Sequence, residues 1–178
     1  MIFMALSDTQ NFINNKELVD KLISFVNFDG ISTVIEIGPG RGIIADSLIG
    51  KIRDFIAVEY DKKLFLELEK RYKNQNIKLV NEDFLKFILP DSPFIVVANI
   101  PFNITADIIK KLINSKMKSA YLIMQKEAGV KYLGAPSAQS PLLSHFIKIK
   151  FEIRKLLDID RKNYTPNPIS RTSIFRVT

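Results

Sequence analysis

The sequence of 178 residues contains no cysteine and a single histidine, His145. A chain without cysteine can form neither a disulfide nor a thiolate metal site, and it has no cysteine nucleophile. One histidine excludes a histidine cluster and disfavours a Ser-His catalytic pair, so we expect His145 to be a packed or surface residue. The sequence therefore predicts chemistry that needs neither thiols nor much imidazole.

Long hydrophobic runs are also missing. No run approaches the roughly 18 apolar residues of a membrane helix, and the apolar start, residues 1–7, lacks the basic region and cleavage site of a secretory signal peptide. Hydrophobic residues still make up 47% of the chain, which is ample for the core of one domain. We expect one soluble, cytoplasmic domain over residues 1–178 that does not contact a membrane.

Acidic residues are scarce in the C-terminal part of the chain. Residues 108–178 contain 14 Lys and Arg against 4 Asp and Glu, whereas residues 1–107 contain 12 against 15. Such asymmetry is typical of a protein that meets a polyanion with one face, because phosphate contacts supply most non-specific affinity for nucleic acids. The alternative is a solvated basic surface that keeps the protein soluble.

Short apolar runs alternate with helical patterns along most of the chain, which predicts a parallel sheet covered on both faces. The expected helices are 15–28, 43–50, 62–72 and 104–113, and the expected strands are 33–37, 55–58, 77–80, 94–98 and 120–124. Residues 147–154 then alternate apolar and charged with a period of two, and 173–177 is a second short strand. The sequence predicts a Rossmann-like α/β fold, mostly parallel, with an antiparallel hairpin at one edge.

Glycines follow the first expected strand in the segment Glu36-Ile-Gly38-Pro-Gly40-Arg-Gly42. Glycines at a strand-to-helix turn let the backbone approach a bound ligand and direct backbone amides toward it. The dinucleotide fingerprint requires a glycine where Ile43 stands, and no Gly-Lys-Ser/Thr follows, so NAD, FAD and a P-loop are disfavoured. The segment resembles motif I of the S-adenosylmethionine-dependent methyltransferases.

Two acidic residues follow the next expected strands. Glu59 lies 19 residues after the second glycine, close to the spacing at which doubly wound folds hold ribose hydroxyls with an acid. Asp83 stands where the methyltransferase pattern has an acid that accepts from the adenine amine, although Glu82 competes for this role. The expected cofactor site includes their neighbours Tyr60 and Phe84.

The segment Asn99-Ile100-Pro101-Phe102 follows the fourth expected strand. Methylation of the exocyclic amine of adenine requires a base held outside its stack and acceptors for the two N–H hydrogens. An Asn oxygen and a neighbouring carbonyl supply such acceptors, proline fixes the loop, and an aromatic ring stacks on the base. These four residues are the candidate catalytic residues.

Together these motifs resemble the rRNA adenine N6-dimethyltransferases, which include the Erm-type 23S rRNA methyltransferases and the 16S rRNA dimethyladenosine transferases. The resemblance covers essentially the whole chain. At its start, the Gln10-Asn11-Phe12-Ile13 segment matches a family motif that covers the cofactor, which implies cofactor contacts for Gln10, Asn11 and Ile13. At its end, residues 164–173 match a late Phe-x-Pro-x-Pro-x-Val-x-Ser motif, with Tyr164 in place of Phe.

The resemblance implies methyl transfer from S-adenosylmethionine, without a metal, to N6 of a flipped adenosine in ribosomal RNA, with S-adenosylhomocysteine as product. Asn99 would also touch the cofactor. Residues 99–109 are similar to the Erm branch, which confers macrolide resistance, so we favour 23S rRNA. The segments 38–40 and 125–127 are similar to the 16S branch, which stays the alternative.

The basic C-terminal part is where we expect ribosomal RNA to bind, to a protein that acts as a monomer. The expected RNA contacts are Lys148, Lys150, Arg154, Arg161 and Lys162. The Lys110-Lys111 pair, in contrast, is expected on a solvated helix face.

Two other functions compete with this interpretation. DNA adenine methyltransferases use a similar loop, but Ile100 and the Gln10-Asn11 pair disfavour them. A methyltransferase-like factor that binds nucleic acid without turnover is the non-enzymatic alternative. Full-length members of the family also carry a helical C-terminal domain after the late motif, whereas this sequence ends at Thr178, so we expect either a natural short form or an isolated catalytic domain without it.

Overall fold

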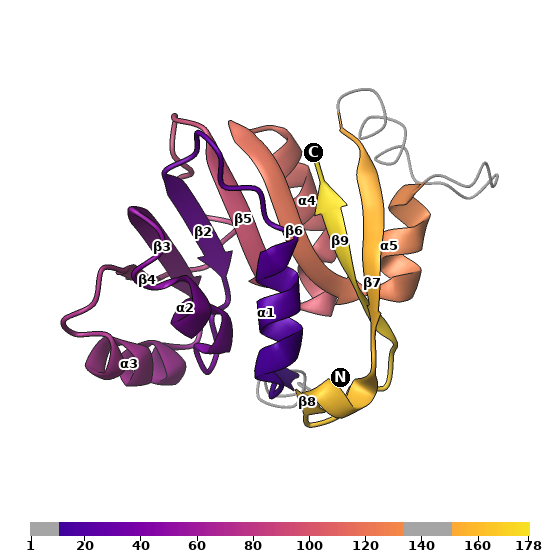
Figure 1. Cartoon of the computed structure of the whole chain (residues 1–178), viewed down its shortest axis with the longest axis horizontal. Coiled ribbons are helices and arrows are strands. Elements are labelled where there is room, and N and C mark those ends of the chain that lie inside the picture. Colours follow the sequence, from indigo (N-terminus) through magenta and orange to yellow (C-terminus); the bar gives the residue numbers. More distant parts are fainter. Residues whose placement is uncertain (1–10, 134–150) are drawn as a thin grey trace.

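The computed structural model describes residues 11–133 and 151–178. Its centre is a seven-stranded sheet in the order β4-β3-β2-β5-β6-β9-β7 (Figure 1). The strands are β2 (Thr33–Ile37), β3 (Asp54–Glu59), β4 (Lys78–Asn81), β5 (Phe94–Asn99), β6 (Met117–Gln125), β7 (Ile153–Ile159) and β9 (Thr172–Val177). The pairs from β4 to β6 are parallel, and β9 runs antiparallel to both β6 and β7. The predicted parallel sheet with an antiparallel edge is confirmed.

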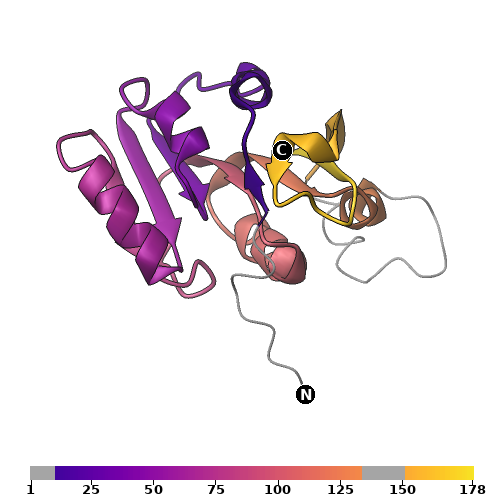
Figure 2. The same ribbon diagram turned by 90° about the horizontal axis from the view of Figure 1, so that it is seen from below.

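Helices cover both faces of this sheet. They are α1 (Lys16–Ser24), α2 (Ile43–Leu48), α3 (Lys62–Arg71), α4 (Thr105–Ile113) and α5 (Lys126–Leu133), with 3-10 turns η2 (Phe102–Ile104) and η3 (Arg161–Asn163). The view along the sheet in Figure 2 shows α1 and α2 on one face and α4 and α5 on the other. The central strands are therefore buried on both sides, which explains their continuous apolar sequences.

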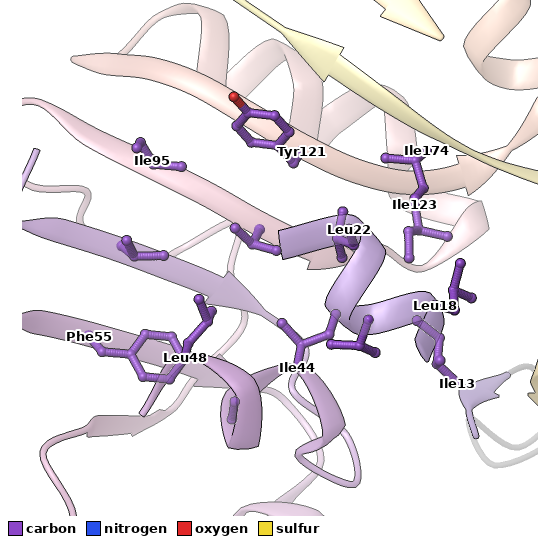
Figure 3. Close-up of a cluster of buried hydrophobic side chains, with 14 of the residues drawn as sticks. Ile13, Leu18, Leu22, Ile44, Leu48, Phe55, Ile95, Tyr121, Ile123 and Ile174 are labelled. Carbon is purple, nitrogen blue, oxygen red and sulfur yellow. The ribbon is translucent and has the colours of Figure 1, made fainter. Parts of the chain in front are cut away.

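Alternate residues of the central strands feed two separate hydrophobic clusters. On β5, Ile95 and Val97 belong to the cluster under α1 and α2, whereas Val96 and Ala98 belong to the cluster under α4. Figure 3 shows the first cluster, where side chains from α1 and α2 meet those of β5 and β6. Each fully buried Val or Ile contributes about 1.5–3 kcal/mol, so these clusters fix the strand register and the ends of the strands.

The first helix is shorter than the sequence predicted. It begins after Asn15, whose side chain accepts from the Leu18 N–H, and its cap is Phe25 instead of the expected Phe28. The Phe25 N–H donates to the Leu22 carbonyl at 3.1 Å, and this bond between residues three apart ends the helix with a tight turn. The apolar residues after it pack on the cluster from irregular backbone, so their spacing extended the helical pattern beyond the helix.

The C-terminal part differs from the expectation in two places. Helix α5 was missed: its Gly129 lies against the Phe175 ring, where an added Cβ would come within 2.1 Å, so the glycine allows close packing on β9. The strand expected over residues 147–154 begins only at Ile153, because pairing with β9 fixes its start, and residues 147–150 lie outside the described part of the chain.

A second, two-stranded sheet joins segments from both ends of the chain. Strands β1 (Phe12–Ile13) and β8 (Tyr164–Thr165) pair antiparallel, Ile13 with Tyr164. The Asn14 N–H donates to the Asn163 carbonyl at 2.9 Å and extends this ladder. β1 is thereby held across the lower edge of the large sheet in Figure 1, where β2 and β5 end.

Candidate active site

A pocket of about 300 Å³ opens at the carboxyl ends of the parallel strands. Ligands of open α/β sheets bind at this edge, because the loops that follow the strands meet there. Twelve residues that the sequence predicted for the site line the pocket: Asn11, Ile13, Gly38, Gly40, Glu59, Tyr60, Asp83, Phe84, Asn99, Ile100, Pro101 and Phe102. Gln10, also predicted, lies outside the described residues.

The glycine loop after β2 forms one wall of this pocket. Gly38 and Gly40 have φ angles of +63° and +58°, a left-handed conformation that glycine adopts without steric cost. The Gly38 N–H donates to the Val58 carbonyl at 2.9 Å, which ties the loop to β3. A Cβ on Gly40 would lie 3.0 Å from the Phe12 ring, so β1 packs directly on the loop.

Glu59 is almost fully buried at the end of β3, with 5% of its surface exposed. One carboxyl oxygen accepts from the Gly40 N–H at 2.9 Å, and the other accepts from the Asp61 N–H at 2.8 Å. Burial raises the pKa of Glu59, and these backbone N–H bonds oppose the rise. The carboxylate therefore braces the glycine loop, while its remaining lone pairs can accept from a ligand.

Glu36 is a second buried acid that the sequence placed in the glycine motif but not among the site residues. It lies in β2, is 1% exposed and lines the pocket. Its Oε2 atom has no hydrogen-bond partner. Burial raises the pKa of Glu36 well above the usual range, and the negative charges of Glu59 and Asp46 raise it further. A cationic ligand group in the pocket would favour its ionised form.

The turn after β4 carries Asp83 and Phe84. The Asp83 carboxylate accepts from the Leu85 N–H at 2.9 Å, which closes the turn. Phe84 is 4% exposed, so its ring is part of the core beneath the pocket. Glu82 also lines the pocket, so the geometry leaves both acids next to the site.

Lys111 of α4 holds this turn from behind. Its ammonium donates to the carbonyls of Phe84, Leu85 and Phe87, at 2.6, 2.9 and 2.5 Å, and lies 5.1 Å from the Phe84 ring centre. Desolvation lowers the pKa of Lys111. The expectation that the 110–111 pair is simply solvated was wrong for Lys111, because its partners are distant in sequence.

Asn99 is the last residue of β5 and connects this strand to the N-terminal segment. Its side-chain nitrogen donates to the Asn11 carbonyl of the N-terminal segment at 3.0 Å. Its side-chain oxygen is buried and has no hydrogen-bond partner. A buried amide oxygen without a partner is destabilising unless a ligand donates to it, which suits an acceptor for an amine.

The residues after Asn99 are fixed by hydrogen bonds to their backbone groups. The Ile100 N–H donates to the Ile123 carbonyl at 3.1 Å, and the Thr105 hydroxyl lies 3.3 and 3.2 Å from the carbonyls of Pro101 and Phe102. Phe102 is partly exposed on the pocket wall. Its ring is therefore accessible to a planar ligand.

Phe12 and Arg41 are two further pocket residues, which the sequence motifs included but did not assign to the site. The Arg41 guanidinium lies 4.7 Å from the centre of the Phe12 ring, a cation–π contact. The pair joins β1 to the glycine loop at the pocket wall. Its members are 29 positions apart, so no local pattern indicated the contact.

The expected RNA contacts separate along the molecule. β7 runs parallel to β5, and Arg154 lies near its start, toward the edge opposite the pocket, where its guanidinium pairs with Glu152 at 2.6 Å. Arg161 and Lys162 follow the end of β7 in η3, on the pocket side, and both are exposed. Lys148 and Lys150, like His145, lie outside the described residues.

Within residues 11–133 and 151–178, no three His, Asp or Glu side chains gather as metal ligands would. None of the helices in these ranges is long and apolar enough to cross a membrane.

The sheet order and the pocket at its carboxyl edge define the fold of the S-adenosylmethionine-dependent methyltransferases. The 23S rRNA methyltransferase ErmE is similar in structure, with a TM-score of 0.84 and 26% identity, over 93% of this chain and 68% of that protein. A dimethyladenosine transferase from Plasmodium falciparum is also similar, with a TM-score of 0.82 and 25% identity, over 93% of this chain and 62% of that protein.

The chain belongs to the ribosomal RNA adenine dimethylase family, which it matches over residues 4–178. Ribosomal RNA small subunit methyltransferase A of Fusobacterium nucleatum is 35% identical over 89% of this chain and 63% of its own length. The rRNA adenine N-6-methyltransferase of Bacillus licheniformis is 29% identical over 95% of this chain and 60% of its own length. The chain thus spans less than two thirds of the length of these relatives.

Proposed function

We propose that the protein transfers a methyl group from S-adenosylmethionine to the exocyclic N6 amine of an adenosine in ribosomal RNA. The observation that carries this proposal is the buried, unpartnered side-chain oxygen of Asn99 in the wall of the pocket that Phe102 also lines. The family supports the same reaction, since its members are rRNA adenine dimethylases.

The residues around the pocket fit this cofactor. The methylsulfonium group, when bound, supplies an electrophilic methyl carbon, so the protein must chiefly align the reacting atoms. Gly38 and Gly40 would lie along the methionine part, Glu59 would accept from the ribose hydroxyls and Asp83 from the adenine amine. The orphaned Glu36 oxygen supports a cationic ligand, because it offers a buried acceptor to a positive group.

A cofactor contact at Glu59 is tested by calorimetry with S-adenosylhomocysteine. Glu59→Gln keeps one acceptor oxygen but removes the charge, and it should weaken binding by about 1–3 kcal/mol, the scale of hydrogen bonds that involve a charged group. Asp54→Asn, at the exposed start of the same strand, is the matched control. Equal affinity of both variants and the parent would remove Glu59 from the cofactor site.

Asn99 and Phe102 would hold the target base. The Asn11 carbonyl fixes the Asn99 nitrogen, which leaves the Asn99 oxygen to accept from the N6 amine and to align it for attack. Phe102 would stack on the base, a contact worth about 1–3 kcal/mol. Methyl transfer leaves the amine with an extra proton, which must then pass to solvent.

Turnover of Asn99 and Phe102 variants tests this arrangement. Phe102→Ala should lower the methylation rate by about 10- to 100-fold, while Phe102→Tyr, which keeps the ring face, should be tolerated. Asn99→Ala should be more damaging because it removes the acceptor and the Asn11 contact. Each variant must melt within a few degrees of the parent. Parental rates in both alanine variants would favour the factor that binds RNA without turnover.

The ribosomal target has two candidates. Similarity of residues 99–109 to the Erm branch and the structural likeness to ErmE favour 23S rRNA, whereas the similarity to small subunit methyltransferase A favours 16S rRNA. We favour 23S rRNA, which would link the protein to macrolide resistance. Primer extension on both rRNAs, from cells with and without the protein, should give a methylation-dependent stop in 23S rRNA. A stop confined to 16S rRNA would assign the other target.

Charge around the pocket indicates the side from which RNA approaches. Glu59 ends β3, and Asp61 and Asp83 follow β3 and β4, whereas Arg161 and Lys162 follow β7 across the sheet. A polyanion would therefore meet the η3 side. Lys162→Glu should weaken RNA binding more than Arg154→Glu, in direct titrations at fixed salt. The opposite ranking would move the footprint to the start of β7.

A further inference from the structure

We propose that Ile169 is an apolar contact for an unpaired nucleotide of the RNA beside the target adenosine. This inference rests on the proposed function. Ile169 lies in the loop of residues 166–171, between β8 and β9, and 92% of its surface is exposed. A single exposed isoleucine is common on protein surfaces. Ile169 differs from such an isoleucine in two respects: its loop is held by hydrogen bonds, and charged residues lie near it in the sequence.

The loop is held on both sides of Ile169. The Ser170 hydroxyl accepts from the Gln125 amide at 2.9 Å, and the Arg171 carbonyl accepts from the Lys126 N–H at 2.9 Å. On the other side, the Asn167 amide nitrogen, in the orientation that satisfies its hydrogen bonds, donates to the carbonyls of Tyr164 and Arg161 at 2.8 and 3.0 Å. Ile169 is therefore presented by a constrained backbone, which reduces the entropy that binding must overcome.

The loop lies on the pocket side of the sheet. Gln125 is the last residue of β6, two positions beyond Ile123, which pairs with Asn99. Neighbouring strands are about 4.8 Å apart and two residues advance a strand by about 6.6 Å, so the Cα atoms of Gln125 and Asn99 are roughly 8 Å apart. The spacing suits a nucleotide next to the flipped one.

The surroundings of Ile169 favour RNA over an apolar partner. Arg161, Lys162 and Arg171 are all exposed on the same loop and on the η3 turn before it, and Thr165 and Asn167 are also exposed. The apolar tip thus belongs to a segment with three exposed cations, one of which, Lys162, lies 3.5 Å from the exposed carboxylate of Asp160. The excess of positive charge suits phosphates around a base face. Proteins that extract or kink a nucleotide often insert an apolar side chain against neighbouring bases.

Ile88 provides a matched control, because it is also an exposed isoleucine, at 88%, in the segment between β4 and β5. Ile169→Ser and Ile88→Ser should both leave the melting temperature and the S-adenosylhomocysteine affinity unchanged, since neither side chain is buried. RNA affinity of Ile169→Ser should fall by about tenfold, the equivalent of burying roughly half an isoleucine side chain. Ile88→Ser should bind like the parent.

Salt dependence separates an apolar contact from a lost phosphate contact. The slope of log affinity against log salt should be the same for Ile169→Ser and the parent, while Lys162→Glu should flatten it by about one unit or less. Equal RNA affinity of the Ile169, Ile88 and parent proteins would overturn the inference, as would a changed slope for Ile169→Ser. The proposed function fails separately, if the parent protein methylates no adenosine in either rRNA.

Discussion

Gly42 carries the most constrained contact of the glycine loop, and its replacement by alanine is a direct test of how α3 supports that loop. Gly42 caps α2 with φ +82°, a left-handed conformation. A Cβ there would lie 2.3 Å from the Tyr72 hydroxyl and 3.0 Å from Leu68 Cδ2. The same hydroxyl bonds the Gly42 carbonyl at 3.0 Å and Asp46 at 2.7 Å. Gly42→Ala must therefore displace Tyr72.

Two costs add up in this variant. The left-handed backbone costs an alanine about 1–2 kcal/mol. Loss of the buried Tyr72 hydrogen bonds adds about 0.5–1.5 kcal/mol for each bond that is not replaced. If neither bond is replaced, Gly42→Ala should thus lower the free energy of unfolding by about 2–5 kcal/mol, a large share of the stability of a typical domain.

Urea unfolding of four variants separates the two costs. Gly50→Ala is the control for backbone conformation, since Gly50 has φ +78° but nothing within 4 Å of an added Cβ, and it should lose only about 1–2 kcal/mol. In the Tyr72→Phe background, which lacks the hydroxyl, the additional loss from Gly42→Ala should approach the Gly50→Ala value. Equal losses for Gly42→Ala and Gly50→Ala in the parent background would refute the steric argument.

Three other variants test the electrostatics of the molecule. Burial raises the pKa of Glu36, so the folded protein holds a proton that the unfolded chain releases, and the parent protein loses stability as pH rises. Glu36→Gln cannot lose this proton. Its melting temperature should therefore rise relative to that of the parent as pH increases from 5 to 8. The Ser173 hydroxyl and Lys155 lower the pKa of Asp158, so the contribution of its carboxylate to stability is present at neutral pH and lost in acid. Asp158→Asn should therefore have a lower melting temperature than the parent at pH 7, and the two melting temperatures should converge at low pH. Lys111→Met should weaken S-adenosylhomocysteine binding severalfold in calorimetry, because three carbonyls lose their donor, while Lys110→Met should not.

The large sheet was predictable because each of its central strands has a recognisable local sequence pattern. β2 and β5 are buried on both faces, so each is a short apolar run ended by a turn or a polar residue. Site residues such as Glu59 and Asn99 are the residues that end parallel strands, and parallel strands necessarily bring such residues to one edge. The positions of the strands and the residues gathered at their carboxyl edge thus followed from the same pattern, whereas the order of the strands was not predicted.

The missed elements depend on partners far away in sequence. β1 and β8 contain two residues each, too few for any periodicity, and they form only because they pair with one another. Helix α5 contains Gly129, a residue of low helix propensity that is used for contact with Phe175. Lys111 looks like any lysine on a helix until the turn after β4 supplies its three acceptors.

The orientation of Asn99 links the two ends of the chain to the expected chemistry. Its nitrogen is held by the Asn11 carbonyl, 88 positions earlier, and the adjacent β1 is held by β8, some 150 positions later. The Asn14 side chain bonds Thr165 at 2.7 Å and the Asn15 side chain bonds Asn163 at 2.7 Å, so this connection has side-chain as well as backbone contacts. Closing such long loops costs entropy, which these contacts must offset. The placement of the Asn99 acceptor therefore depends on the pairing of β1 with β8, and the loop that carries Ile169 follows the same β8 strand.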